Sequence, residues 1–220
     1  MIHFDRVCKN YPNGHAALTD VSFHLNRGEM AFLTGHSGAG KTTLLKLIIM
    51  MESVTHGQIY VDNRHLLHLP SRQIPYLRRC IGMIFQNPQL LYHCTVFDNV
   101  AIPLIISGYH HKEIKRRVRA ALDKVGLLKK EKLFPLALSS GEQQRVGIAR
   151  AIVNKPMIVL ADEPTGNLDP ELSFEIMRLF AAFHNVGVTL LVATHDLALI
   201  ARLNHRVLYL KEGCLLGDSR

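Results

Sequence analysis

The feature that most constrains the fold is the stretch Gly35–Thr42, which reads Gly-His-Ser-Gly-Ala-Gly-Lys-Thr. An apolar run at 30–33 precedes it, and a largely apolar run at 44–49 follows it. This order predicts strand, phosphate-binding loop and helix, because backbone N–H groups of such a loop and of the helix N-terminus converge on phosphate oxygens. A glycine-rich turn without a ligand is the alternative, and the flanking runs favour the nucleotide site.

The end of this loop carries the chemistry that a nucleotide needs. Lys41 is expected to reach the β and γ phosphates, and Thr42 is expected to hold Mg²⁺ through its hydroxyl. The predicted nucleotide-binding residues of the stretch are Gly35, His36, Ser37, Gly38, Ala39, Gly40, Lys41, Thr42 and Thr43. We therefore expect a nucleotide and Mg²⁺ as ligands.

Composition indicates an ordinary globular chain. Of its 220 residues, 48% are hydrophobic and 20% are charged, which suits one large domain or two small lobes. The four cysteines form no CxxC pair or metal-binding spacing, which favours reduced thiols in a cytosolic protein. The 13 histidines also lack partners at a metal-binding spacing, so no metal ion is expected at them. No signal-peptide pattern is present and no apolar run reaches about 18 residues, so neither export nor a membrane span is expected.

One segment, 110–132, carries most of the formal net charge of +8, because it contains nine Lys or Arg residues and three Asp or Glu residues. Apolar residues recur within it at Ile114, Val118, Leu122 and Val125. This helical spacing predicts an apolar stripe beneath a basic face. Such a face suits anionic lipid or nucleic acid, although a solvated helix face is the commoner explanation. Because the segment lacks stacking aromatic residues, no nucleic acid partner is expected.

The remaining pattern predicts an α/β fold. Residues 1–34 alternate short apolar runs with turns and indicate an antiparallel β region. Further strands are predicted at 57–63, 81–85, 157–161 and 188–193, and helices at 95–107, with a break near Pro103, and at 170–185. Alternating strands and helices predict a mainly parallel sheet. We expect a core lobe of about 1–88 and 152–220, with an inserted helical lobe of about 89–151.

Polar side chains follow three of the predicted strands at their carboxyl ends, the edge where ligands bind in parallel sheets. Nucleotide hydrolysis needs charge neutralisation, an oriented water and a group that accepts its proton. Asp162 is expected to support Mg²⁺, and adjacent Glu163 is expected to act as the general base. His195 is positioned to contact the γ phosphate, and Gln86 to assist Mg²⁺ and the attacking water.

Two further stretches carry helix-start signals. Asp169 and Pro170 fit the cap and the first position of the helix predicted at 170–185. Ser139, followed three residues later by Glu142, forms a capping-box pattern. A helix N-terminus with Ser and Gly is also an anion site, and the two interpretations are compatible. The chain would then hold two phosphate-seeking sites that are far apart in sequence.

These motifs together resemble the ATP-binding subunits of the ABC superfamily over essentially the full chain. The corresponding motifs are Walker A at 35–42, the Q-loop at Gln86, the signature at 138–142, Walker B at 158–163, the D-loop at 167–169 and the switch His195. The resemblance implies a P-loop NTPase core of the ABC ATPase type that hydrolyses ATP. It also implies a head-to-tail, ATP-dependent homodimer in which Ser139 and Gly141 of one copy close on the ATP of the other. Tyr11 matches the aromatic residue that stacks on adenine.

Within the superfamily, four stretches are similar to the cell-division ATPases: 30–41, 81–86, 98–106 and 120–127. This similarity implies an integral membrane partner of the FtsX type and contacts with other division proteins. It further implies a peripheral location on the cytoplasmic face of the bacterial inner membrane. In this scheme, ATP-driven closure of two subunits bends the membrane partner and activates peptidoglycan hydrolases.

Ser140 departs from the family pattern, which usually has Gly at this position of the signature. A side chain there is expected to crowd phosphate or to disfavour a glycine-type backbone, and so to lower activity. Two alternatives to the cell-division role stay open. One is the ATPase of a lipoprotein-release or macrolide-export transporter, whose motifs are much the same. The other is a nucleotide-dependent scaffold that barely hydrolyses ATP.

Overall fold

The computed structural model describes residues 1–166 and 168–219. Its strands are β1 (Ile2–Asn10), β2 (Ala16–Leu25), β3 (Met30–Thr34), β4 (His56–Val61), β5 (Arg64–His65), β6 (Ile81–Ile84), β7 (Ile158–Asp162), β8 (Thr189–Ala193), β9 (Arg206–Lys211) and β10 (Cys214–Ser219). Its α-helices are α1 (Lys41–Ile48), α2 (Ile74–Arg79), α3 (Val96–Ile106), α4 (His111–Lys124), α5 (Ser140–Ile152), α6 (Pro170–Asn185) and α7 (Leu197–Leu203). Short 3₁₀ turns connect several of them.

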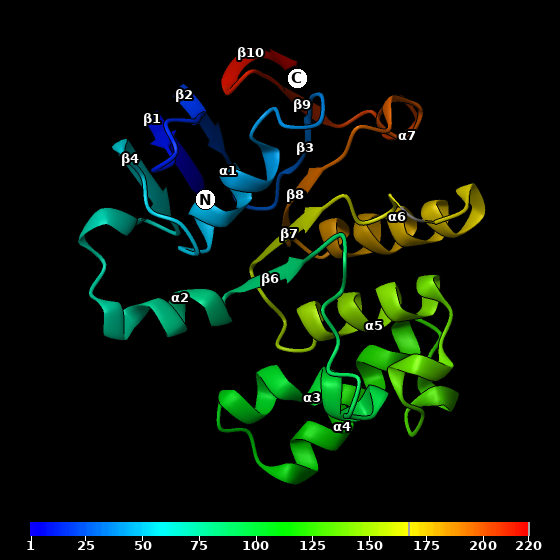
Figure 1. The fold of residues 1–220 in the computed structure, drawn as a ribbon. Coiled ribbons are helices and arrows are strands. Elements are labelled where there is room, and N and C mark those ends of the chain that lie inside the picture. The colour runs from blue at the N-terminus through cyan, green and yellow to red at the C-terminus, as the bar shows by residue number, and fades with distance from the viewer. Residues whose placement is uncertain (167, 220) are drawn as a thin grey trace.

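Two sheets organise these elements (Figure 1). The larger has the order β10-β9-β3-β8-β7-β6, and all of its pairs are parallel except β9 with β10. The smaller is antiparallel, with the order β2-β1-β4-β5. Every residue of β3 and β8 is buried, as expected of parallel strands covered on both faces. The predicted mainly parallel sheet and antiparallel β region are therefore confirmed.

The two faces of the parallel sheet support separate hydrophobic clusters. Along β3, Ala31 and Leu33 point to the face where α1 packs between the two sheets. Phe32 points the opposite way, into the cluster that includes α3, α4, α5 and α6. This alternation follows from the two-residue period of a strand. The helices that follow β6 thus share a continuous core with the sheet that carries the phosphate loop.

Helices α3, α4 and α5 lie between β6 and β7 in the chain and form the green region in the lower part of Figure 1. The predicted apolar stripe of α4 is buried, as Ile114, Val118 and Leu122 show. The predicted break near Pro103 is wrong, because α3 continues to Ile106. The proline removes one ladder hydrogen bond only a turn before the helix ends, and the capping box of Thr95 and burial of the helix hold it together.

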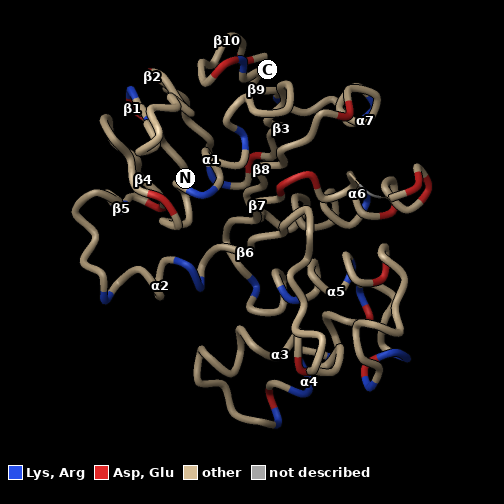
Figure 2. The backbone as a smooth tube through the Cα atoms, viewed as in Figure 1, with Lys and Arg blue, Asp and Glu red and all other residues tan. Residues whose placement is uncertain are grey.

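The basic segment is partly neutralised by its own acids. Arg117 pairs with Glu113 at 2.7 Å, and Arg119 pairs with Glu131 at 3.1 Å. Figure 2 shows Lys and Arg residues around the sheets and among the helices, with Asp and Glu residues interspersed.

Across 1–166 and 168–219, no helix is both long and apolar enough to cross a membrane, and no group of three His, Cys, Asp or Glu residues could hold a metal ion.

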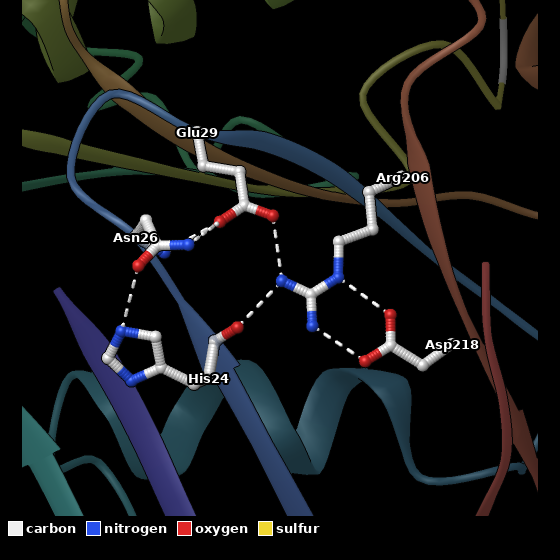
Figure 3. A network of polar contacts seen from close by, with 5 residues as sticks. All are labelled: His24, Asn26, Glu29, Arg206 and Asp218. Carbon is white, nitrogen blue, oxygen red and sulfur yellow. Dashed lines mark hydrogen bonds and ion pairs between the residues drawn. The ribbon is translucent and has the colours of Figure 1, made fainter. Parts of the chain in front are cut away.

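A polar network around one buried arginine joins β9 and β10 to residues 24–29 (Figure 3). Arg206 of β9 donates two hydrogen bonds of 2.6 Å to the carboxylate of Asp218 in β10. It donates two more to Glu29 and to the carbonyl of His24, at 2.7 and 2.6 Å. The hydrogen bond to Asp218 is the main cause that raises the pKa of Arg206, against the effect of burial. Only 6% of the arginine side chain is exposed, so the guanidinium is buried, whereas Asp218, with 37% of its side chain exposed, stays in contact with solvent.

Candidate active site

A cavity of about 630 Å³ lies at the carboxyl ends of the parallel strands, a size typical of small-molecule sites. It brings together every predicted phosphate-loop residue and all the predicted strand-end residues. The lining comprises Gly35, His36, Ser37, Gly38, Ala39, Gly40, Lys41, Thr42, Thr43, Gln86, Asp162, Glu163 and His195. Five more lining residues were missed by sequence reasoning, since no local signal marks them: His15, Ala17, Thr34, Leu197 and Tyr209.

The backbone of the loop needs glycine at specific positions. Gly40 caps α1 with a left-handed φ of 103°, and a Cβ built on it would lie 2.5 Å from the carbonyl oxygen of Ala17. Gly38 also has a left-handed φ, of 77°, but a Cβ there would meet no atom within 4 Å. Position 40 therefore requires glycine both for its backbone conformation and for lack of space, whereas position 38 requires glycine only for its backbone conformation.

Replacing these two glycines is expected to give unequal losses of stability. Gly38→Ala adds backbone strain of about 1 kcal/mol, whereas Gly40→Ala adds a further ~1–3 kcal/mol because β2 must move away from the new methyl group. Thermal or urea unfolding of the two variants measures the difference. Equal unfolding free energies would contradict the packing assigned to Gly40.

Lys41 follows the phosphate loop, and its ammonium group lies between loop carbonyls and the carboxylate of Glu163. Its Nζ donates hydrogen bonds to the carbonyls of Gly35 at 2.7 Å and His36 at 3.1 Å. The same Nζ lies 3.7 Å from Oε1 of Glu163. The ammonium is thus held within the cavity, at a point from which its flexible stem can follow a phosphate group.

Asp162 is the last residue of β7, and only 8% of it is exposed. Burial raises its pKa, an effect that a hydrogen bond from the Thr42 hydroxyl partly offsets. Hydroxyl and carboxylate oxygens are the ligands that Mg²⁺ prefers, and the amide of Gln86 lines the same cavity. The oxygen donors of Thr42 and Asp162 therefore fit the expected metal ion.

Replacing Asp162 is expected to separate stability from function. Because its folded pKa lies above the unfolded value, its carboxyl stabilises the fold at low pH, and this contribution is lost as pH rises through the raised pKa. At neutral pH the charged form therefore weakens the fold, and Asp162→Asn should raise the melting temperature while it abolishes Mg²⁺-dependent hydrolysis. Differential scanning calorimetry at pH 7.5 tests this. A lower melting temperature would contradict it.

Glu163 connects two strand ends. It adopts a left-handed backbone, with φ of 45°, and its N–H donates to the carbonyl of Ala193 at the end of β8. Its Oε2 lies 2.9 Å from Nδ1 of His195. A residue other than glycine costs about 1–3 kcal/mol in this conformation. The strained backbone places the carboxylate between Lys41 and His195, where it could receive a proton from water.

Three predicted site residues do not line this cavity. The hydroxyl of Tyr11 lies 3.3 Å from Oγ1 of Thr43, which places the ring beside the start of α1. Ser139 and Gly141 lie at the N-terminus of α5. There the predicted capping box is confirmed, because Ser139 and Glu142 exchange hydrogen bonds of 3.1 and 3.3 Å. Asn167 of the D-loop lies outside the described residues.

The signature segment contains features that its sequence does not reveal. A Cβ on Gly141 would lie 2.2 Å from Cδ2 of Leu172, so a larger residue there would require the Leu172 side chain of α6 to move. Ser140 is the first residue of α5 and does not have a positive φ, so its backbone needs no glycine. Lys130 pairs with Glu142 at 2.5 Å, and this hydrogen bond is the main cause that lowers the pKa of Glu142.

The fold and this site together define the class of protein. The profile of the family described as "ABC transporter" matches residues 18–166. The chain belongs to this family, and it is an ATPase of the cassette type. The predicted fold class is thereby confirmed.

Individual relatives give a narrower similarity. The chain is 60% identical over 217 residues to the cell division ATP-binding protein FtsE of Escherichia coli (strain K12), covering 99% of this chain and 98% of that protein. Identity to FtsE of Bacillus subtilis (strain 168) is 44% over 219 residues, covering 100% of this chain and 96% of that protein.

Solved structures of ATP-binding cassettes resemble this chain in fold. A dimeric post-hydrolysis state of the ATP-binding cassette MJ0796 bound to ADP and Pi matches with a TM-score of 0.92 and 34% identity, covering 100% of this chain and 98% of that chain. CbiO1 of Clostridium perfringens, part of the transporter complex cbiONQ, matches with a TM-score of 0.90 and 30% identity. This match covers 99% of this chain and 87% of that chain.

Proposed function

We propose that this chain is the ATP-hydrolysing subunit of a bacterial cell-division complex and works with a membrane protein of the FtsX type. The observation that carries this proposal is one cavity in which the phosphate loop, Asp162, Glu163 and His195 meet. The 60% identity to FtsE supports the division role. The relevant residues stand at three separate strand ends, so the fold is what assembles them.

The first task of the site is to bind the triphosphate. The loop from Gly35 to Gly40 surrounds the phosphates with backbone N–H groups, and Lys41 exchanges its loop carbonyls for phosphate oxygens. Thr42, Asp162 and Gln86 would hold Mg²⁺. Bound there, the ion would neutralise charge that develops on the β and γ phosphates.

The second task is to activate water. Glu163 accepts the proton of the attacking water as its general base, and His195 orients the glutamate through the 2.9 Å contact while it faces the γ phosphate. Lys41, 3.7 Å from the same carboxylate, places a positive charge beside it.

The third task is to close the site with a second copy. Ser139 and Gly141 lie on α5 and do not line their own cavity, yet the N-terminus of α5 offers free N–H groups to an anion. A head-to-tail dimer gives these groups the γ phosphate of the partner's ATP, and Tyr11 gives adenine an aromatic face. The dimeric state of the MJ0796 cassette supports this arrangement.

The fourth task is to pass closure to the membrane. The core lobe covers about 1–88 and 152–220, and the helical lobe covers about 89–151. The two lobes move together around the site, and they act on the membrane partner through the groove near Gln86 and 90–105. The chain then sits peripherally on the cytoplasmic face of the inner membrane, with no role for nucleic acid. Closure bends the partner and so activates septal peptidoglycan hydrolases.

Purification of the tagged chain from native bacterial membranes in MgATP tests the partner. Recovery of a protein of the FtsX type is expected. Recovery of a lipoprotein-releasing or macrolide-exporting permease in its place would overturn the division role while leaving the ATPase intact.

Ser140 tests the alternative of a weakly hydrolysing scaffold. Because its backbone is ordinary helix, any inhibition must come from its side chain at the partner's phosphate. Ser140→Gly is expected to raise turnover in a phosphate-release assay, with unchanged stability within about 1 kcal/mol. If turnover stays slow and unchanged, Ser140 is not the cause, and the scaffold interpretation loses the residue that suggested it.

A further inference from the structure

A second cavity, of about 760 Å³, lies at the opposite edge of the parallel sheet from the nucleotide site. Arg27, Met157 and Val188 of its lining come just before β3, β7 and β8, which places it at the amino ends of these strands. The C-terminal ends of α4, α5 and α6 complete it. None of its lining residues belongs to the cavity described above.

The floor and the rim of this cavity differ in chemistry. Its floor is apolar and largely buried, formed by side chains such as Val153, Val159 and Phe183. Val186, which is 77% exposed, leaves an apolar lip in contact with solvent. All five polar side chains in the lining are cations: Arg27, Arg116, Arg117, Lys124 and Lys155. No Asp, Glu, Ser, Thr, Asn or Gln accompanies them in the lining.

The charge at the rim exceeds what its surroundings neutralise. Glu113 pairs with Arg117 and lies 3.9 Å from Arg116, and Asp62 pairs with Arg27 at 3.3 Å. Five cations against two carboxylates leave an excess of three. The C-terminal ends of three helices supply about half a negative charge each, so a positive balance remains. Within 1–166 and 168–219, the side chains of Lys124 and Lys155 form no ion pair or hydrogen bond.

We propose that this cavity binds a single-chain anionic amphiphile, whose aliphatic chain lies on the Phe183 floor and whose carboxylate or phosphate head meets Lys124 and Lys155. An apolar floor beneath unpaired cations complements both halves of such a ligand. The site also accounts for part of the basic segment 110–132, which nucleotide hydrolysis does not use.

A peptide is a poorer match for the same surface. Its backbone brings N–H donors that need acceptors, and the cationic side chains of the lining accept no hydrogen bonds, which leaves only carbonyls at the helix ends. An aliphatic chain makes no such demand. A nucleic acid is also a poor match, because Phe183, which is the aromatic residue of the lining, is buried and cannot stack on bases.

Isothermal titration of the full chain with dodecyl phosphate below its micelle concentration tests the proposal. Saturating MgADP keeps the probe out of the phosphate loop, so failure here leaves the proposed ATPase untouched. Saturable binding to one site is expected, with dodecanoate binding similarly. Inorganic phosphate and dodecyl maltoside each carry one half of the ligand and should bind at least about tenfold more weakly.

Variants locate the site. Lys124→Glu with Lys155→Glu, and separately Val186→Asp at the exposed lip, should weaken dodecyl phosphate at least about tenfold. Lys129→Glu with Lys132→Glu makes the same change of charge on exposed lysines outside the cavity and should leave affinity unchanged. Circular dichroism checks that all variants fold. Equal losses in both double variants would overturn the proposal.

Two further results would also overturn it. Binding to phosphatidylglycerol vesicles without binding of monomeric dodecyl phosphate would indicate a lipid surface and not a pocket. Displacement of dodecyl phosphate by an alternating Asp-Leu peptide that binds more tightly would indicate a protein segment as the natural occupant.

Discussion

Glu163→Gln is expected to lower ATP turnover by at least about 100-fold while leaving ATP binding intact, because the amide fills the same space but cannot accept the proton of water. The contacts of Glu163 with Lys41 and His195 are polar and tolerate an amide of the same shape. Phosphate release under saturating MgATP measures turnover, and a fluorescent ATP analogue measures binding.

The chain offers a matched control for this substitution. Glu212 is exposed and also has a left-handed backbone, with φ of 48°, so Glu212→Gln makes the same chemical change on the same kind of backbone outside the cavity. Its turnover should equal that of the unmodified chain. Wild-type turnover in Glu163→Gln would remove this glutamate from the role of base.

Arg206→Met is expected to lower the free energy of unfolding by about 3 kcal/mol, because it leaves Glu29 and Asp218 without their shared cation. The value lies at the low end for a buried ion pair, since these two side chains are 21% and 37% exposed and can regain water. The melting temperature should fall by roughly 6–12 °C. The network in Figure 3 joins β2, the turn between β2 and β3, β9 and β10, so its loss should loosen both sheets.

Arg119→Met is the matched control for this loss. Arg119 also forms an arginine-carboxylate pair, with Glu131 at 3.1 Å, but 48% of its side chain is exposed. Because the arginine of this pair reaches solvent, whereas Arg206 does not, the loss should be smaller, about 1 kcal/mol. If urea unfolding gives the two methionine variants the same stability, the network around Arg206 does not act as part of the core.

Features with local causes could be predicted from the sequence. Asp169 and Pro170 predict the start of α6, where Asp169 accepts a hydrogen bond from the N–H of Leu172 at 2.9 Å. Ser139 and Glu142 similarly predict the start of α5. The nucleotide cavity follows from a topological rule, because residues at the carboxyl ends of parallel strands share one edge.

Features that depend on distant partners could not be predicted. Arg206 and Glu29 are separated by 177 residues, and no periodicity relates them. Lys130 reads as one more cation of a basic segment until α5 brings Glu142 to it. Pro103 carries a strong local signal for a break, yet burial of α3 overrides it. Tertiary packing decides each of these cases.

The phosphate loop supplies half of the proposed ATP site, and Ser139 of a second copy supplies the other half. Light scattering of Glu163→Gln with and without saturating MgATP tests this most directly. The expected mass is that of one chain without nucleotide and twice that mass with ATP. Addition of Ser139→Arg, which blocks the α5 N-terminus, should return the mass to that of one chain. A variant that binds ATP yet keeps the mass of one chain would contradict it.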